Sequence, residues 1–178
     1  MQLKKKGESA QIGGVNQFMI TLRWTTAVDF DLCAVYEDKK GEEGIVYFGD
    51  LGNLNEFPFM QLSGDEGVGD TGGDNQEDLR VMNLAPMKKI YIFCWDYPSV
   101  ESGQVARFSN SDITTSVIDD HGNSYTCSLD NMEDGNVVCM AEIDNSSPLG
   151  AKFVNRSTVG KLHGLDKLAQ LLDIAKKI

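Results

Sequence analysis

Carboxylates and glycines are crowded together between Ser63 and Val81, where the chain reads SGDEGVGDTGGDNQEDLRV. Six of these nineteen residues are acidic and five are glycine. Carboxylates held within about 4–6 Å of one another raise each other's pKa values unless a cation joins them. Ca²⁺ takes about six to eight oxygen ligands from carboxylates, amides and backbone carbonyls, and glycine permits the tight turns that such a cage requires. The stretch is therefore a candidate site for a hard divalent cation.

The same composition also describes a solvated surface loop. Counted from Asp65 as position one, the third and fifth positions of an EF-hand would be Gly67 and Gly69, and the twelfth is Gln76 rather than Glu. A calcium-binding nonapeptide array would need several copies, and the chain holds one at most. The residues of this loop alone leave both interpretations open.

A second pair of carboxylates, Asp29 and Asp31, stands two residues apart immediately before an apolar run. Residues i and i+2 of an extended chain project to the same side, so both carboxylates could face one ion. Aspartate is also common where strands begin. This pair, taken alone, therefore fits a structural role equally well.

The balance of charge narrows the class of partner. The chain has 27 acidic and 16 basic residues, a formal net charge of −11, and fourteen of the acidic residues lie between Asp29 and Asp78. Nucleic acids and anionic membranes are bound through basic patches, so neither is expected as a partner. Cation binding and plain solubility both agree with the acidic balance.

The elements that must position these carboxylates are predicted to be strands. Apolar Phe18, Ile20, Leu22 and Trp24 alternate with mostly polar residues over 17–24, which is the period of a half-buried strand. Turn residues separate the shorter apolar runs that follow, so we expect strands at Leu32–Tyr36, Ile45–Phe48, Ile90–Trp95, Val105–Phe108, Ile113–Ile118, Tyr125–Leu129, Val137–Ile143 and Lys152–Val154. This spacing predicts a mainly β fold, an antiparallel two-sheet β-sandwich.

The C-terminal end has a different pattern. Over 164–178 the apolar residues fall on one stripe of a helix, which predicts an amphipathic helix that packs on the sandwich. No linker divides the chain, so residues 1–178 are expected to form a single domain of a size that buries a substantial core.

Cysteines and hydropathy indicate the compartment. Each of the four cysteines lies in an apolar or strand-like run, with no CxxC pair, so buried free thiols are expected. The basic N-terminus lacks the apolar stretch of a signal peptide, and no window of 18 apolar residues could span a membrane. We expect a cytoplasmic protein without membrane insertion.

Taken together, the two acidic motifs resemble the TerD family, the tellurite-resistance and stress-response domain. Asp29-Phe30-Asp31-Leu32 looks like the DxD motif that opens a strand in that family. Residues 63–66 and 73–77 look like the two halves of its acidic loop, and Leu79–Val81 looks like the strand after that loop. The resemblance extends to Leu3–Gly7 at the start of the chain and to 151–153 with 164–165 near its end. It therefore covers nearly the whole sequence.

The resemblance implies a cytoplasmic, non-enzymatic β-sandwich that binds one or two Ca²⁺ ions and acts with a protein partner, in some members a membrane-associated one. The predicted metal site draws on both motifs. Glu66 and Asp78 are expected to be second-layer or solvated rather than ligands. The predicted ligands are the side chains of Asp29, Asp31, Asp65, Asp70, Asp74, Asn75 and Glu77 and the backbone carbonyls of Gly67 and Gly72.

Other functions for the same residues stay open. A sandwich with calcium loops can bind carbohydrate in the manner of a lectin, which is the main alternative. A metal-dependent hydrolase also clusters carboxylates, but the acidic loop has no neighbouring His, Lys or nucleophile motif. We therefore expect a binding or interaction module and not an enzyme.

Overall fold

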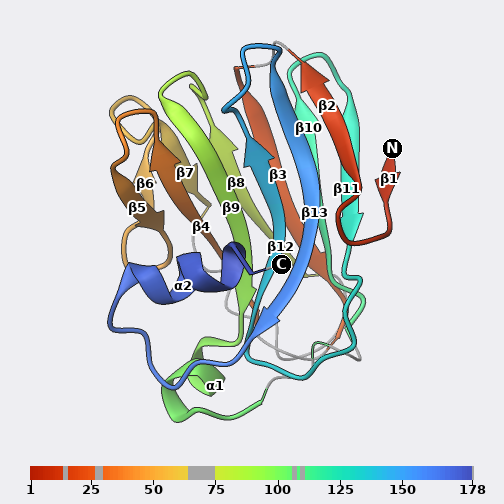
Figure 1. Cartoon of the computed structure of the whole chain (residues 1–178), viewed down its shortest axis with the longest axis vertical. Coiled ribbons are helices and arrows are strands. Elements are labelled where there is room, and N and C mark those ends of the chain that lie inside the picture. Colours follow the sequence, from red (N-terminus) through yellow and green to blue (C-terminus); the bar gives the residue numbers. More distant parts are fainter. Residues whose placement is uncertain (14–15, 27–29, 64–74, 106–107, 109–110, 178) are drawn as a thin grey trace.

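The computed structural model describes residues 1–13, 16–26, 30–63, 75–105, 108 and 111–177 (Figure 1). Within them the chain forms two β-sheets that pack face to face. Sheet A has seven strands, in the spatial order β1 (Gln2–Leu3), β11 (Ser124–Ser128), β10 (Thr114–Asp119), β3 (Phe18–Trp24), β8 (Asn75–Val81), β7 (Met60–Leu62) and β6 (Gly52–Asn53). Sheet B has six, in the order β2 (Ser9–Gly13), β13 (Ala151–Gly160), β12 (Val137–Asp144), β9 (Met87–Trp95), β4 (Asp31–Asp38) and β5 (Glu43–Val46).

The predicted antiparallel sandwich is confirmed, with one parallel exception. The short strand β1 pairs in parallel with β11, and the other strand pairs are antiparallel. Most predicted strands are present within a few residues of their expected bounds, but the prediction at Val105–Phe108 is wrong where it can be judged, because neither Val105 nor Phe108 lies in a strand. The short strands β1, β2, β6 and β7 were not expected, because none of them is a continuous apolar run.

Two apolar layers hold the fold together. The larger lies between the sheets and contains the inward side of each, such as Ile20, Leu79, Ile92 and Phe153. The second lies on the outer side of sheet B, where Cys33, Phe93 and Cys139 pack beneath the C-terminal helix. Sheet B is therefore apolar on both faces, whereas sheet A buries one.

The C-terminal helix α2 (Leu168–Ala175) covers the outer face of sheet B, against β4, β12 and β13 (Figure 1). It is shorter than the predicted 164–178. Gly164 has a left-handed φ of 77° and its N–H donates to the Val100 carbonyl, which holds the preceding segment in a non-helical conformation. The helix begins where Gln170 Oε1 accepts from the amides of Asp166 and Lys167. In the described part of the chain no helix is long and apolar enough to cross a membrane.

A short helix, α1 (Tyr97–Ser102), follows β9 at the lower end of the molecule in Figure 1. Asp96 caps its N-terminus by accepting from the Ser99 amide, and Gly103 ends it in a left-handed conformation. Buried Asn136 ties this helix to the rest: its amide nitrogen donates to the carbonyls of Gln104 and Leu162, and its oxygen accepts from Leu162 N–H.

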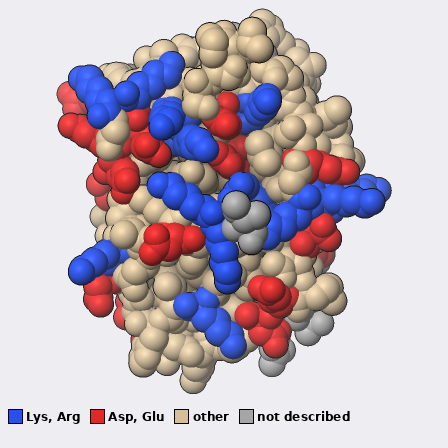
Figure 2. Space-filling view, viewed as in Figure 1, with Lys and Arg blue, Asp and Glu red and all other residues tan. Residues whose placement is uncertain are grey.

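Basic and acidic side chains are interspersed over the face that carries α2 (Figure 2). Some of them form ion pairs across sheet B. Glu142, which is buried, lies 2.9 Å from Lys89 Nζ and 3.7 Å from Arg156 Nη1, and Arg156 Nη2 also donates to the Ala175 carbonyl at the end of α2. These contacts attach the helix terminus to β9, β12 and β13.

Candidate metal site

The strands that follow the two predicted motifs begin at the same end of the sandwich. In the sequence, residues 64–74 precede β8 of sheet A and 27–29 precede Phe30 and β4 of sheet B, and Glu77 near the start of β8 contacts Leu32 near the start of β4. Of the nine predicted ligands the structure describes Asp31, Asn75 and Glu77. The other six predicted ligands lie outside the described residues: Asp29, Asp65, Gly67, Asp70, Gly72 and Asp74.

Glu77 links the two sheets. It faces the interior together with Leu79 and is 4 % exposed, and its Oε2 accepts a 2.6 Å hydrogen bond from the backbone N–H of Leu32. Pairing between β4 and β5 begins only at Ala34, so the edge amide of Leu32 lies beyond the end of β5. The Glu77 carboxylate of sheet A thus accepts the hydrogen bond that Leu32 N–H could have given to a neighbouring strand, and in the described part of the chain β5 does not extend that far.

Asp31 lies directly beside this contact, at the first position of β4. Strand alternation places it on the same side as Cys33, toward the α2-covered layer, while Leu32 faces the layer between the sheets. Burial first, and then the negative charges of Asp31 and Glu77, raise the pKa of the Cys33 thiol well above its ordinary value. The same two carboxylates raise the pKa of Cys94 after burial. Both charges are therefore close to the same thiols.

Asn75 stands two residues before Glu77 on the same side of β8 and is buried. It is opposite Trp24 of β3, whose ring meets Phe30 edge-on at 5.7 Å. Because Phe30 immediately precedes Asp31, this aromatic contact brings the start of β4 to the start of β8. An amide oxygen and two carboxylates from chain segments far apart in sequence are thus gathered at one end of the fold.

Asp78 projects from the opposite face of sheet A to Glu77. It lies on the outer side of β8, where its Oδ1 accepts from Thr21 Oγ1 at 2.8 Å and from Gln76 Nε2 at 3.0 Å. The backbone pleat separates it from its neighbour Glu77, so the two adjacent carboxylates serve opposite faces of sheet A. Asp78 was expected not to be a ligand, and Glu66, expected likewise, lies outside the described residues.

The chemistry of these donors suits a hard cation. Asp31, Asn75 and Glu77 offer carboxylate and amide oxygens, the ligand type that Ca²⁺ and Mg²⁺ prefer. No group of three or more His, Cys, Asp or Glu close enough to hold a metal occurs among the described residues, which include only two of the predicted carboxylate ligands. Asn75 and Glu77 project from β8 into the interior, whereas Asp31 projects from β4 toward the α2-covered layer.

The cysteines behave as the sequence predicts. All four are free and buried. Cys33 and Cys139 stand opposite Phe93 from its two neighbouring strands, so two strand spacings, roughly 10 Å, separate their backbones. That distance is too great for a disulfide.

A polar cavity of about 480 Å³ adjoins Asn75. Arg23 and Gln76 line one part of it, and Asp112 lines another and accepts from Thr25 N–H at 2.8 Å. Partial burial by itself would raise the pKa of the Asp112 carboxyl, but hydrogen bonds from Thr25 and Thr26 outweigh this effect, and the pKa is lowered. Sequence reasoning missed Asp112 and Thr25, which lie 87 residues apart and share no local motif.

The described residues define the class of this protein as a two-sheet β-sandwich with a C-terminal helix on one outer face. No family model matches the chain, and no curated protein matches it significantly. Two solved structures share its fold. One is a homologue of the telluride resistance protein TerD, SCO6318 from Streptomyces coelicolor A3(2), with a TM-score of 0.55, 12% identity, and 89% of this chain and 95% of that chain covered. The other is a protein of unknown function, SAV2460, with a TM-score of 0.54, 11% identity and the same coverage. The fold implied by the resemblance to TerD is confirmed; at this identity the comparisons show the fold alone.

Proposed function

We propose that this chain is a calcium-binding stress-response module, in which Ca²⁺ organises the acidic loop at 63–78 against the DxD motif at 29–31. The observation that carries the proposal is the contact between Glu77 and the Leu32 amide. It joins the strand after the acidic loop to the strand after the DxD motif, next to Asp31. A cation bound by both motifs would hold the two sheets together at this end.

The proposed ligands follow the predicted set. Asp31 and Glu77 would supply carboxylate oxygens, Asn75 an amide oxygen, and the remaining ligands would come from Asp29 and the residues of 65–74. One or two ions could be held by this number of donors. The bound cation would neutralise the mutual repulsion of the carboxylates and order the loop.

The module is proposed to act through binding and not through catalysis, in the cytoplasm and with a protein partner. Neither name among the two solved structures with this fold is that of an enzyme. By analogy with the TerD homologue, resistance to tellurite or another chemical stress is the proposed biological context. The carbohydrate-binding alternative has no observation of its own in its favour.

Calcium titration calorimetry tests the proposal with matched variants. Glu77→Gln removes the charge but keeps an oxygen for the Leu32 amide, and Asp31→Asn does the same for the DxD motif. Each should weaken calcium binding by about 10-fold or more. Asp78→Asn, an equal change one residue away on the other side of β8, should leave binding unchanged.

A second measurement checks the link to stability. A ligand that binds only the folded state adds about 2.7 kcal/mol at a hundredfold excess over its Kd, so calcium should raise the melting temperature relative to EDTA. No heat of binding in the wild type, or equal weakening by Asp78→Asn, would contradict the proposal. Glycan binding that appears only with calcium would favour the lectin alternative.

A further inference from the structure

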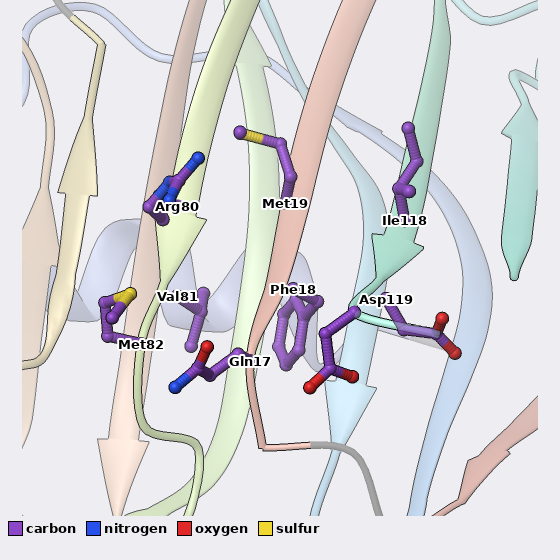
Figure 3. A pocket seen from close by; sticks show the side chains of 9 residues that line it. Gln17, Phe18, Met19, Arg80, Val81, Met82, Ile118 and Asp119 are labelled. Carbon is purple, nitrogen blue, oxygen red and sulfur yellow. The ribbon is translucent and has the colours of Figure 1, made fainter. Parts of the chain in front are cut away.

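A second surface with a distinct composition lies on the outer face of sheet A, at the end of β3, β8 and β10. A shallow cavity of about 200 Å³ is lined here by residues of these strands and the positions just beyond them (Figure 3). Phe18, Val81 and Asp119 point inward and are buried. The six residues that alternate with them point outward and form what we name the Arg80–Asp120 surface: Gln17, Met19, Arg80, Met82, Ile118 and Asp120.

Strand register arranges these six residues in two rows of three. Arg80, Met19 and Ile118 are direct cross-strand partners, which defines the first row. Met82, Gln17 and Asp120 each lie one residue beyond the last paired position of their strands, Val81, Phe18 and Asp119, and extending the register by one residue gives the second row. The only charged groups of the six, Arg80 and Asp120, therefore occupy diagonally opposite corners.

The remainder of this face of sheet A is polar and satisfies its own hydrogen bonds. Thr21 donates to Asp78, and the hydroxyls of Ser116 and Thr126 share a 2.9 Å hydrogen bond. The Arg80–Asp120 surface differs, because Ile118 is 36 % exposed and the partly exposed Met19 and Met82 lie on the same surface. Ile118 and Met82 occupy the two corners that the charges leave free, and Met19 lies in the middle of the first row.

This pattern is complementary to itself. With strands about 4.8 Å apart and two residues spanning about 6.7 Å, the Arg80 and Asp120 positions are about 12 Å apart. When two copies face each other about a two-fold axis in the plane of the interface, each position meets its mirror image across that axis. An axis that crosses the Arg80–Asp120 line at its midpoint and at a right angle brings each Arg80 opposite the other copy's Asp120. The same axis passes between Met19 and Gln17 and within about 2 Å of the Met82 and Ile118 positions.

We propose that the Arg80–Asp120 surface binds a second copy of this chain, forming a two-fold symmetric dimer. Two reciprocal Arg80–Asp120 pairs flank a centre in which Met82 and Ile118 each pack near their own symmetry mates. The surface suits self-association despite the net charge of −11, since its two charges cancel locally. His121 Nε2 lies 3.6 Å from Asp120 Oδ1 at the rim, and Asp119 is engaged with the amides of His121 and Asn123 in its own turn. The dimer does not depend on the proposed calcium site, which involves the opposite end of β8.

Sedimentation velocity of the full chain over 1–200 µM tests the proposal. The wild type should show a concentration-dependent species of twice the 19.6 kDa chain mass. Arg80→Asp and Asp120→Arg each turn two attractive pairs into repulsive ones and should weaken dimerisation by about 10-fold or more. The double variant Arg80→Asp/Asp120→Arg exchanges the charges and should restore it. Arg23→Asp, a reversal at an exposed position near the other end of β3, should have no effect.

Cross-linking tests the position of the axis. Ile118→Cys places a thiol close to its own symmetry mate, and the four native thiols are buried, so a short bismaleimide cross-linker, which spans more than a disulfide, should give a covalent dimer. Leu149→Cys, at a position that is 87 % exposed and belongs to sheet B's edge region, should not cross-link. A wild type that stays monomeric at 200 µM overturns the proposal. So does a dimer that both single charge reversals leave intact, since it would use another surface.

Discussion

The two outer faces of the sandwich contrast in what covers them. Sheet B is covered by α2, and its central strands β4, β9 and β12 are buried on both sides. The outer face of sheet A carries exposed Arg23 and Arg80 and hydrogen-bonded polar side chains instead. A strand that is buried on both faces has a continuous apolar sequence, as in IYIFCW of β9. Strands β3 and β8, which have one solvent-exposed face, instead alternate apolar and polar residues.

The largest expected difference between the outer faces of sheets A and B is in the free energy of unfolding that is lost when a side chain is truncated. Phe93 of β9 is fully buried beneath α2, and Phe93→Ala should lower the free energy of unfolding by about 3–5 kcal/mol. Met19→Ala on the open face of sheet A should cost about 1 kcal/mol or less. Urea denaturation measures both. Equal losses would mean that the two faces are packed alike, and the contrast would fail.

A substitution in α2 can detach this helix from the outer face of sheet B. Leu171 of α2 is fully buried in the outer layer of sheet B, so Leu171→Asp should detach the helix and expose Cys33 and Cys139 while the sandwich remains. The number of thiols that react with a chromogenic disulfide reagent under native conditions should rise from none to about two. Ala169→Asp, at an exposed position of the same helix, is the control and should leave all four thiols protected. Unchanged protection in Leu171→Asp would mean that β-sheet packing alone shields them.

Alkaline pH gives the smallest and most specific test. Burial, opposed by the nearby Arg156 cation, raises the pKa of the Cys139 thiol far above its ordinary value of about 8.5. Above that pH the unfolded chain loses a proton that the folded chain keeps. The contribution of this thiol to stability is therefore complete below about pH 8.5 and declines as pH rises toward the folded pKa.

Cys139→Ala should remove that decline. Between pH 9 and 10.5 the free energy of unfolding of the wild type should fall more steeply than that of the variant, by about 1.4 kcal/mol per pH unit. Urea denaturation at a series of pH values measures both slopes, and titration of other groups cancels in the difference. Identical slopes would show that the thiol is already accessible to solvent beneath α2.

Several side chains important to the fold lay beyond any local pattern. Asn136 follows Asp134 and Gly135, a combination typical of turns, yet it is 1 % exposed and joins α1 to the segment before α2. Asn155 is likewise buried within β13 and donates to the carbonyls of Leu3 and Ser128. Their partners are up to 152 residues away, so neither period nor composition could reveal them.

The sequence by itself determined the class of fold, the approximate position of most longer strands, the C-terminal helix, the buried thiols and the two acidic motifs. These features are local, because side-chain period and turn chemistry act over a few residues. Only the tertiary structure decided that Glu77 faces inward to Leu32 while Asp78 faces outward, and that Arg80 and Asp120 share one surface. Such pairings depend on strand register, in which a shift of one residue turns every side chain to the other face, and register is set by packing across the whole sandwich.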